Sequence, residues 1–154
     1  MSIDQTTLLF FDASCLIAAA GSPSGGSAFL LSLCARGFLQ AAVSQPVLLE
    51  AERNIRLKLP PSALGTYQRL VILTPMIIVP FPSRTSRHEC RKIVGDKDEH
   101  VLAAAIEAAA PFVLTLDKAL ETKVNAAGLP VQALAPGAFI KTILPKHVDY
   151  PAIR

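Results

Sequence analysis

The chain has 154 residues, of which 51% are apolar and 18% are charged, and its formal net charge is +3. These values fit one compact domain with a hydrophobic core, so we expect a single functional site. A membrane-spanning helix is not expected. The longest nearly uncharged stretch, Val101 to Leu116, contains Glu107 and Pro111, and it is shorter than the roughly 18 apolar residues that a span requires.

The N-terminus and the cysteines bear on the cellular compartment. Residues 1–5 place Asp4 where a secretory signal would carry Lys or Arg, so we expect the protein to stay in the cytoplasm. Cys15, Cys34 and Cys90 are odd in number and show no CxxC spacing. This pattern argues against both a disulfide framework and a zinc site, and we expect free thiols.

Two stretches share a surplus of positive side chains. They are Arg53, Arg56 and Lys58 in the first, and Arg84, Arg87, Arg91 and Lys92 in the second. Such runs are often solvated faces, but they also suit a surface that faces a polyanion. Both interpretations stay open at this point.

In the first half of the chain, apolar runs alternate with helical patterns. The run from Leu8 to Phe11 is uninterrupted, which is typical of a strand buried on both faces of a parallel sheet. Ser27 and Ser44 can each cap a following helix. The elements expected here are a strand over 8–11, a short helix over 15–20, a helix over 28–36, a strand over 41–43 and a helix from 44 to the Pro60-Pro61 break.

The alternation continues in the second half, where Asp98 can cap a helix and Gly128 can end one. The basic stretch 83–92 is expected to be a loop or a short helix. The other elements are a helix over 62–73, a strand over 76–79, a helix over 99–110, a strand over 112–115, a helix over 118–127, a strand over 131–134 and a helix over 136–143. This order predicts an α/β fold whose open parallel sheet, of about five strands, is covered on both faces. We expect one domain over 1–145 and a loosely held tail over 146–154.

Four carboxylates are predicted to share one edge of this sheet. Asp12 and Asp117 each follow a buried strand, Asp98 begins a helix, and Glu50 lies one turn into another helix. In open parallel sheets, ligands bind beyond the carboxyl ends of the strands. Four like charges repel one another unless a divalent cation is present, and oxygen ligands select magnesium or manganese over zinc. The pattern therefore predicts a metal site.

Each acid also has a purely structural interpretation. Asp98 alone is most simply a helix cap, Asp12 and Asp117 are turn residues, and Glu50 is a solvated first-turn acid. It is the four acids together that favour a metal site.

Four further polar residues lie close to these acids in the sequence. We expect Asp96 to assist as an outer ligand, and Glu52 and Glu99 to be surface charges. His100 follows Asp98 on the predicted helix, but a single His without a carboxylate partner is more often structural than a general base.

The opening and the closing segments resemble the PIN-domain family. Phe10 to Ile17 is similar to the family's first strand, which ends in Asp followed by a small residue and then Ser, Thr or Asn. Val47 to Ala51 resembles the family's second acidic position, which lies on a helix. Val131 to Phe139 is similar to its last strand and Pro-started helix.

The most specific similarity lies between these segments. Asp96 to Ala105, followed by Phe112 to Asp117, resembles the family's Asp-capped, Ala-rich helix and the strand that ends in Thr-x-Asp. Leu116 departs from the pattern, because many relatives carry Gly there. The resemblance covers residues 7–143.

The resemblance implies a three-layer α/β/α PIN-like fold and a metal-dependent ribonuclease that hydrolyses RNA phosphodiester bonds. The implied site consists of an acidic quartet that binds Mg²⁺ or Mn²⁺ and two supporting hydroxyls. The quartet is Asp12, Glu50, Asp98 and Asp117, and the hydroxyls are those of Ser14 and Thr115.

Many PIN-domain proteins are VapC-like toxins that a cognate antitoxin holds inactive, and many form homodimers. The resemblance therefore implies RNA, an antitoxin and a second copy of the chain as partners. A free-standing RNA-processing nuclease and a non-cleaving scaffold that binds RNA or protein remain alternatives. An acidic site repels phosphate, so we expect a basic rim to hold the RNA. Its residues would be Arg53, Arg56, Arg84, Arg87 and Arg91.

Overall fold

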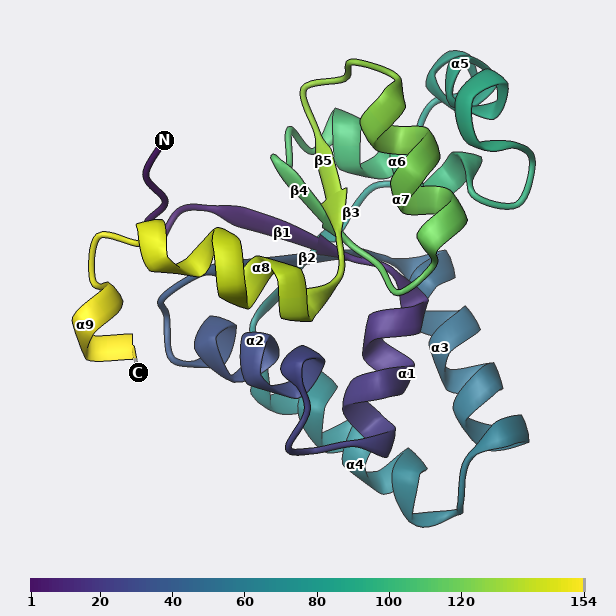
Figure 1. Ribbon diagram of the computed structural model, residues 1–154. Helices are drawn as coiled ribbons and strands as arrows, with labels where there is room; N and C mark the ends of the chain where they lie inside the picture. The colour runs from purple at the N-terminus through teal and green to yellow at the C-terminus, as the bar shows by residue number, and fades with distance from the viewer. Residues whose placement is uncertain (154) are drawn as a thin grey trace.

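The computed structural model describes residues 1–153, which form a central sheet between two layers of helices (Figure 1). All five strands run parallel, in the order β3-β2-β1-β4-β5. They are β1 (Leu8–Phe11), β2 (Gln40–Ser44), β3 (Met76–Val79), β4 (Phe112–Leu114) and β5 (Gln132–Leu134). The predicted parallel sheet is confirmed.

The central strand β1 explains why its sequence is an uninterrupted apolar run. Leu9 lies opposite Ala41 of β2 on one side and Phe112 of β4 on the other. Leu9, Phe10 and Phe11 are fully buried, because helices cover both faces of the strand and neighbouring strands cover both edges.

The helices divide between the two faces of the sheet. They are α1 (Ala13–Gly21), α2 (Gly26–Ala35), α3 (Gln45–Lys58), α4 (Ser62–Leu73), α5 (Arg84–Val94), α6 (Glu99–Glu107), α7 (Lys118–Ala126), α8 (Pro136–Thr142), the 3-10 turn η1 (Leu144–Lys146) and α9 (Tyr150–Ile153). Helix α5 packs on α6 and α7 to form one layer, whereas α1 packs on α2, α3 and α4, and α2 packs on α8, to form the other. The predicted three-layer arrangement is confirmed.

Several predicted boundaries agree with the structure, and others need correction. Helix α4 and strand β3 have the predicted bounds. Ser27 is not a cap, because α2 begins at Gly26 after the N-cap Gly25 and buries Ser27. Helix α6 ends before 110, since Ala109 adopts a left-handed backbone with φ of 56°.

Helix α5 is the largest departure from the predicted elements. It is a regular helix of 11 residues that buries Cys90 and Val94 and exposes most of its polar side chains. Its first turn is capped by Ser83, whose amide and hydroxyl donate to the carboxylate of Glu107 on α6. A partner 24 positions away leaves no local signal in the sequence.

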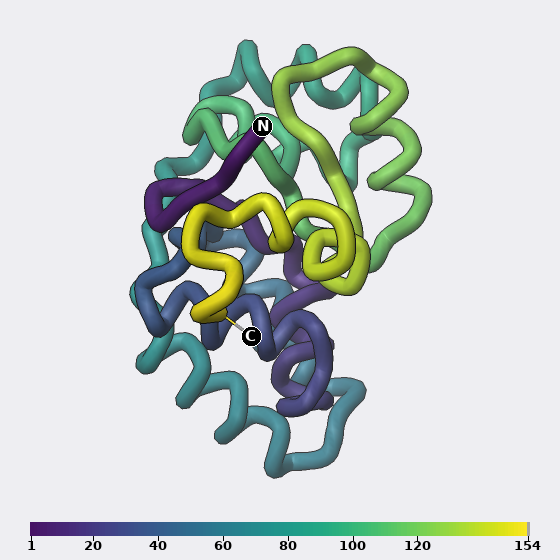
Figure 2. The backbone as a smooth tube through the Cα atoms, turned by 60° about the vertical axis from the view of Figure 1, so that its left-hand side comes forward, coloured from purple at the N-terminus to yellow at the C-terminus, as the bar shows by residue number. Residues whose placement is uncertain are grey.

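The C-terminal segment is packed onto the domain as far as Ile153. His147 is 4% exposed, its Nε2 lies 2.7 Å from the carbonyl oxygen of Phe38, and its backbone bridges to Ile3. The N-terminal residues therefore run beside the C-terminal segment (Figure 2). The expectation of a loosely held tail does not hold for residues 146–153.

The cysteines and the apolar helices agree with the sequence analysis. Cys15, Cys34 and Cys90 are free and buried, and burial raises the pKa of Cys15 and Cys34 to about 12. No single helix in residues 1–153 is long and apolar enough to cross a membrane. Among the helices that the structure describes, one pair, α1 and α2, reaches that length and composition together, and the two helices meet at a bend of 99°.

Candidate functional site

The candidate site lies where the direction of the sheet connections reverses. From β1 the chain passes through α1 and α2 to β2, whereas from β4 it passes through α7 on the other face to β5. Strands β1 and β4 are neighbours, and the amide of Asp12 donates to the carbonyl of Leu114 at 3.0 Å. Open α/β sheets bind ligands beyond the strand ends at such a reversal. Asp12 and Asp117 both lie there.

Asp12 is held by three hydrogen bonds. Its Oδ1 accepts from the amide of Ala13 at 2.8 Å, and its Oδ2 accepts from Ser14 Oγ at 3.1 Å and from Thr115 Oγ1 at 2.8 Å. The residue is only 8% exposed, and Thr115 is fully buried. A carboxylate offers about four acceptor positions, so Asp12 keeps about one for a further ligand.

The two hydroxyls also tie the turn after β4 to the turn after β1. Ser14 Oγ accepts from the amide of Leu116 at 3.0 Å, and Thr115 Oγ1 accepts from the amide of Asp117 at 3.1 Å. The turn therefore forms with Leu116 in the place of Gly. Asp117 in turn caps α7, because its Oδ1 accepts from the amides of Ala119 and Leu120.

Asp98 differs from Asp12 in its surroundings. It is the N-cap residue of α6, but its side chain accepts no capping hydrogen bond. Burial raises the pKa of Asp98, the negative charges of Asp12, Asp117 and Glu50 raise it further, and Lys97 opposes them. Asp12, Asp117 and Glu50 are therefore close enough for their charges to act on Asp98.

The acids form an open cluster and not a closed metal cage. Among residues 1–153, no three His, Cys, Asp or Glu side chains are gathered tightly enough to hold an ion as they stand. The donor set nevertheless suits a hard divalent cation, because it consists of carboxylates that retain free oxygens. A cation between them would also relieve the repulsion that raises the pKa of Asp98.

The corner between α5 and α6 is held by Arg91. Arg91 donates to both oxygens of Glu99, from Nη2 at 3.1 Å and from Nε at 3.2 Å, and pairs with Asp96 Oδ1 at 3.2 Å. Glu99 is 8% exposed, so it is not a surface charge. Asp96 is engaged by Arg91 and not by the acidic cluster. Arg91 is therefore held by two acids, and half of its side chain is exposed.

This clamp gives the corner a structural purpose that the sequence did not reveal. Arg91 grips the residues on both sides of Asp98, namely Asp96 two positions before it and Glu99 directly after it. Helix α5 ends at Gly95, whose φ of 89° turns the chain toward α6. Nothing in the spacing of these charges distinguishes a clamp from a solvated run.

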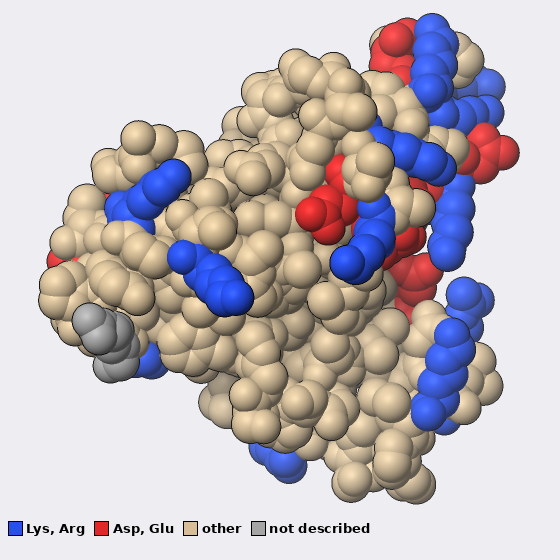
Figure 3. Space-filling view, viewed as in Figure 1, with Lys and Arg blue, Asp and Glu red and all other residues tan. Residues whose placement is uncertain are grey.

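The remaining arginines differ in how free they are. Arg53 and Arg84 are exposed, whereas Arg56 lies 3.4 Å from Glu52. Arg87 stacks 4.8 Å from the ring centre of Phe81 and donates to the carbonyl of Pro82. Figure 3 shows acidic side chains between basic groups over α5 above and over α3 below.

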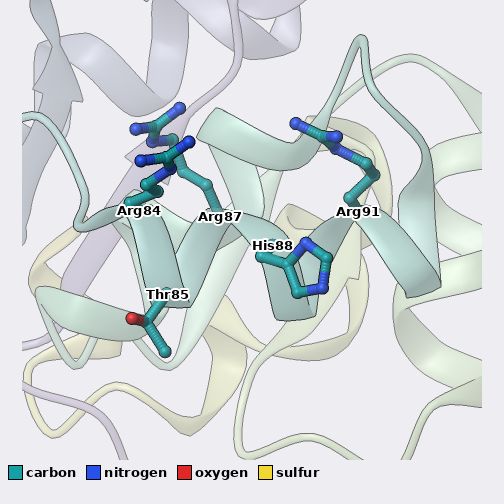
Figure 4. A pocket seen from close by; sticks show the side chains of 5 residues that line it. All are labelled: Arg84, Thr85, Arg87, His88 and Arg91. Atoms are coloured by element: carbon teal, nitrogen blue, oxygen red, sulfur yellow. The ribbon is translucent and has the colours of Figure 1, made fainter.

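A hollow of about 510 Å³ on α5 is lined by Arg84, Thr85, Arg87, His88 and Arg91. The guanidinium groups of Arg84 and Arg87 lie together there, with Arg91 farther along the helix (Figure 4). Arg84 has no side-chain partner within residues 1–153, whereas Arg87 and Arg91 are each held by neighbouring groups.

Comparison with known protein families finds one match for this sequence. A family profile described as PIN domain matches residues 9–119. No curated protein matches the chain. The match includes all four acids of the open cluster.

Three solved structures have a similar fold. VapBC2 from Rickettsia felis, bound to a DNA fragment from its promoter, has a TM-score of 0.64 at 14% identity, over 84% of this chain and 98% of that one. PAE2754 from Pyrobaculum aerophilum has a TM-score of 0.54 at 17% identity, over 77% of this chain and 85% of that one. VapC20 from Mycobacterium tuberculosis, a toxin that cleaves the sarcin-ricin loop, has a TM-score of 0.49 at 16% identity, over 80% and 98%.

Proposed function

Because this chain belongs to the PIN-domain family, we propose that it is a metal-dependent endoribonuclease that hydrolyses RNA phosphodiester bonds. The observation that carries the proposal is that Asp12 and Asp117 lie together where β1 and β4 end, joined through the hydroxyls of Ser14 and Thr115. This is the sheet edge where ligands are expected, and the charges of Asp12, Asp117 and Glu50 reach Asp98 there.

We propose that these four acids hold Mg²⁺ or Mn²⁺. When bound, the ion would activate a water molecule and neutralise charge on the phosphate. The contribution of the chain is to position the ligands. Ser14 and Thr115 fix the orientation of Asp12 through hydrogen bonds to Oδ2, so that this carboxylate needs little rearrangement.

The basic rim is proposed to hold the RNA while the acids act on one phosphate. Arg53 and Arg56 lie on α3, and Arg84 and Arg87 lie on α5, so basic groups are present on both sides of the acids. Phosphate contacts of this kind supply most of the affinity of a strand without reading its sequence.

A cleavage assay tests the proposed activity. The unaltered chain should cut single-stranded RNA in the presence of Mg²⁺ or Mn²⁺, and a chelator should stop the reaction. Asp12→Asn should lower the rate by at least about 100-fold, because it removes a ligand charge. The exposed Asp149 offers a matched control, since Asp149→Asn should cut at the unaltered rate. Cleavage by Asp12→Asn at that same rate would overturn the proposal.

We further propose that the chain is the toxin of a toxin–antitoxin pair. The similarity of its fold to that of VapBC2 from Rickettsia felis supports this assignment. Induced expression should then arrest bacterial growth, and expression of Asp12→Asn should not. If both proteins were tolerated equally well, the assignment as a toxin would fail, whereas cleavage in vitro would still stand on its own assay.

The homodimer that the resemblance implies is proposed to form around the edge strand β3. Large apolar side chains are exposed on β3, on the adjoining helix α4 and on the loop after β3, namely Ile72 at 80%, Ile77 at 47%, Ile78 at 53% and Phe81 at 57%. Exposed apolar patches and uncovered strand edges usually mark interaction surfaces. Sedimentation should show a dimer that Ile78→Lys dissociates. A monomeric unaltered chain at micromolar concentration would contradict the proposal.

A further inference from the structure

Beside Glu50, on the flank of α3, lies a hollow that the acidic cluster does not explain. Its volume is about 500 Å³, and its lining includes Pro46, Leu49, Arg53 and His100 as well as Glu50. A divalent ion sits about 2.0 to 2.6 Å from its oxygen ligands and needs far less space. The hollow therefore suits a larger ligand that would lie next to the ion.

The imidazole of His100 gives this hollow a defined hydrogen-bond donor. Its Nδ1 is buried and has no hydrogen-bond partner among the described residues. Nε2 likewise has no hydrogen-bond partner within residues 1–153. The ring lines the hollow, so Nε2 can donate to a ligand there in the tautomer that carries the proton on this nitrogen. The Nε2–H group is thus available to a ligand.

Arg53 supplies a second donor, and Pro46 and Leu49 form the apolar part of a wall that also contains Glu50 and the Arg56–Glu52 pair. Arg53 is exposed and forms no ion pair with another described residue, whereas Arg56 is paired with Glu52. Leu49 is 59% exposed although it is apolar, and Pro46 lies beside it in the lining. Two donors and an apolar wall match an RNA nucleotide, whose phosphate accepts hydrogen bonds and whose sugar and base pack on apolar surfaces.

We propose that this hollow is the subsite for the nucleotide next to the bond that is cut. This inference rests on the proposed function, because Glu50 belongs both to the acidic cluster and to the wall of the hollow. The Nε2–H group of His100 and the guanidinium of Arg53 donate to the oxygens of one phosphate. The attached sugar and base lie on Leu49 and Pro46. A base in that position is unpaired, so the substrate is single-stranded RNA.

The variant His100→Phe tests the subsite, since it keeps a ring of similar size and removes both nitrogens. RNA affinity is measured in the Asp12→Asn background with a short single-stranded RNA. His100→Phe should weaken binding about tenfold, which is the usual effect of losing a hydrogen bond to a charged group. In the active chain the same change should raise KM more than it lowers kcat. The melting temperature should not fall, because Nδ1 has no partner to lose.

Arg53→Ala should weaken RNA binding and lower its salt dependence by about one unit of slope. The matched control is Arg69→Ala on α4, which removes the same charge from an exposed position outside the hollow and should leave RNA affinity unchanged. Calorimetry should show that His100→Phe, made in the unaltered chain, binds Mn²⁺ normally.

Each outcome of these experiments has a definite meaning. Unchanged RNA affinity in His100→Phe overturns the subsite even when the unaltered chain cleaves RNA. Weakened Mn²⁺ binding in His100→Phe also overturns it, because His100 would then act on the ion and not on the nucleotide. A failure of the unaltered chain to cleave RNA overturns the proposed function on which the subsite rests.

Discussion

Two corners at the same edge of the sheet hold their carboxylates by different means. Where β1 and β4 end, Asp12 itself accepts hydrogen bonds from a backbone amide and from the hydroxyls of Ser14 and Thr115. Between α5 and α6, Asp98 accepts no capping bond. There the neighbours of Asp98 are held instead, through the clamp formed by Arg91.

The two corners differ in how many oxygen acceptor positions of the carboxylate remain free for a ligand. Asp12 has most of its acceptor positions filled, so its orientation is fixed before any ligand arrives. Asp98 has a fixed backbone and an unbonded carboxylate, and its raised pKa shows that its negative charge is unfavourable in the folded chain. We therefore expect the first corner to set the geometry of the site and the second to respond to ion binding.

The largest effect should come from breaking the first corner with Thr115→Val. The change keeps the volume but removes the donor to buried Asp12 and the acceptor for the amide of Asp117. Leaving buried polar groups unpaired should lower the free energy of unfolding by about 2 kcal/mol, measured by urea denaturation. Thr122→Val is the matched control, because that exposed hydroxyl donates only to the carbonyl of Lys118. Equal losses in the two variants would show that the corner has no special role.

A second variant, Arg91→Gln, breaks the clamp and leaves Asp98 chemically intact. The affinity for Mn²⁺ should fall about tenfold, as is usual when a group that supports a metal ligand is removed, and calorimetry measures it. Lys92→Gln is the control on the same helix, since Lys92 pairs only with exposed Glu89 at 3.3 Å. The clamp would lose its assigned role if both variants bound Mn²⁺ alike.

The two corners also differ in how far the sequence predicts them. The first could be predicted, because buried runs such as Leu8 to Phe11 mark a parallel sheet, and the acids that follow such strands must meet at one edge. Thr115 and Ser14 were likewise expected to support the acids. Which groups they bond, with Thr115 bridging Asp12 to the amide of Asp117, required the structure.

The second corner could not be predicted, because its contacts depend on how α5 packs. The stretch from Arg84 to Val94 has three apolar residues, Cys90, Ile93 and Val94, which stand at helical spacing, but its first half is entirely polar, and only Cys90 and Val94 are buried. Burial of Glu99 follows from the approach of Arg91 across the turn at Gly95. A pair of charges eight positions apart has no characteristic spacing, so the sequence alone predicts a surface charge at Glu99.

A pH series sharpens the comparison, because burial and then the neighbouring acids raise the pKa of Asp98 above its ordinary value of 3.8. The native chain then binds this proton more tightly than the unfolded chain, so stability is lost as pH rises through the raised pKa. Without metal, Asp98→Asn should therefore melt above the unaltered chain at neutral pH. This gain in stability should be smaller than the loss of stability in Thr115→Val. It should vanish when the pH is below the ordinary pKa of Asp.

Asp12→Asn serves as the comparison in that series. Because Asp12 accepts two hydroxyl hydrogen bonds at Oδ2, its replacement should bring no gain in the melting temperature of the metal-free chain. With Mn²⁺ added, the unaltered chain should melt at a higher temperature than Asp98→Asn, since the ion stabilises only a chain that binds it. A gain in Asp12→Asn as large as that in Asp98→Asn would remove the distinction between the corners.

The smallest effect should separate two arginines of one helix. Arg84 is exposed and unpaired within residues 1–153, whereas Arg91 is held by Glu99 and Asp96. Arg84→Ala should weaken RNA binding severalfold and lower its salt dependence by about one unit of slope, with no change in Mn²⁺ affinity. Arg36→Ala is the control, because Arg36 lies far from the acids. It follows α2 and stacks 5.0 Å from the ring centre of Phe38, before β2 begins, at the sheet edge opposite to the acids.

The slopes are measured by filter binding in the Asp12→Asn background across a salt series. Equal slopes for Arg84→Ala and Arg36→Ala would mean that α5 contributes only the Arg91 clamp to the site and does not grip the RNA.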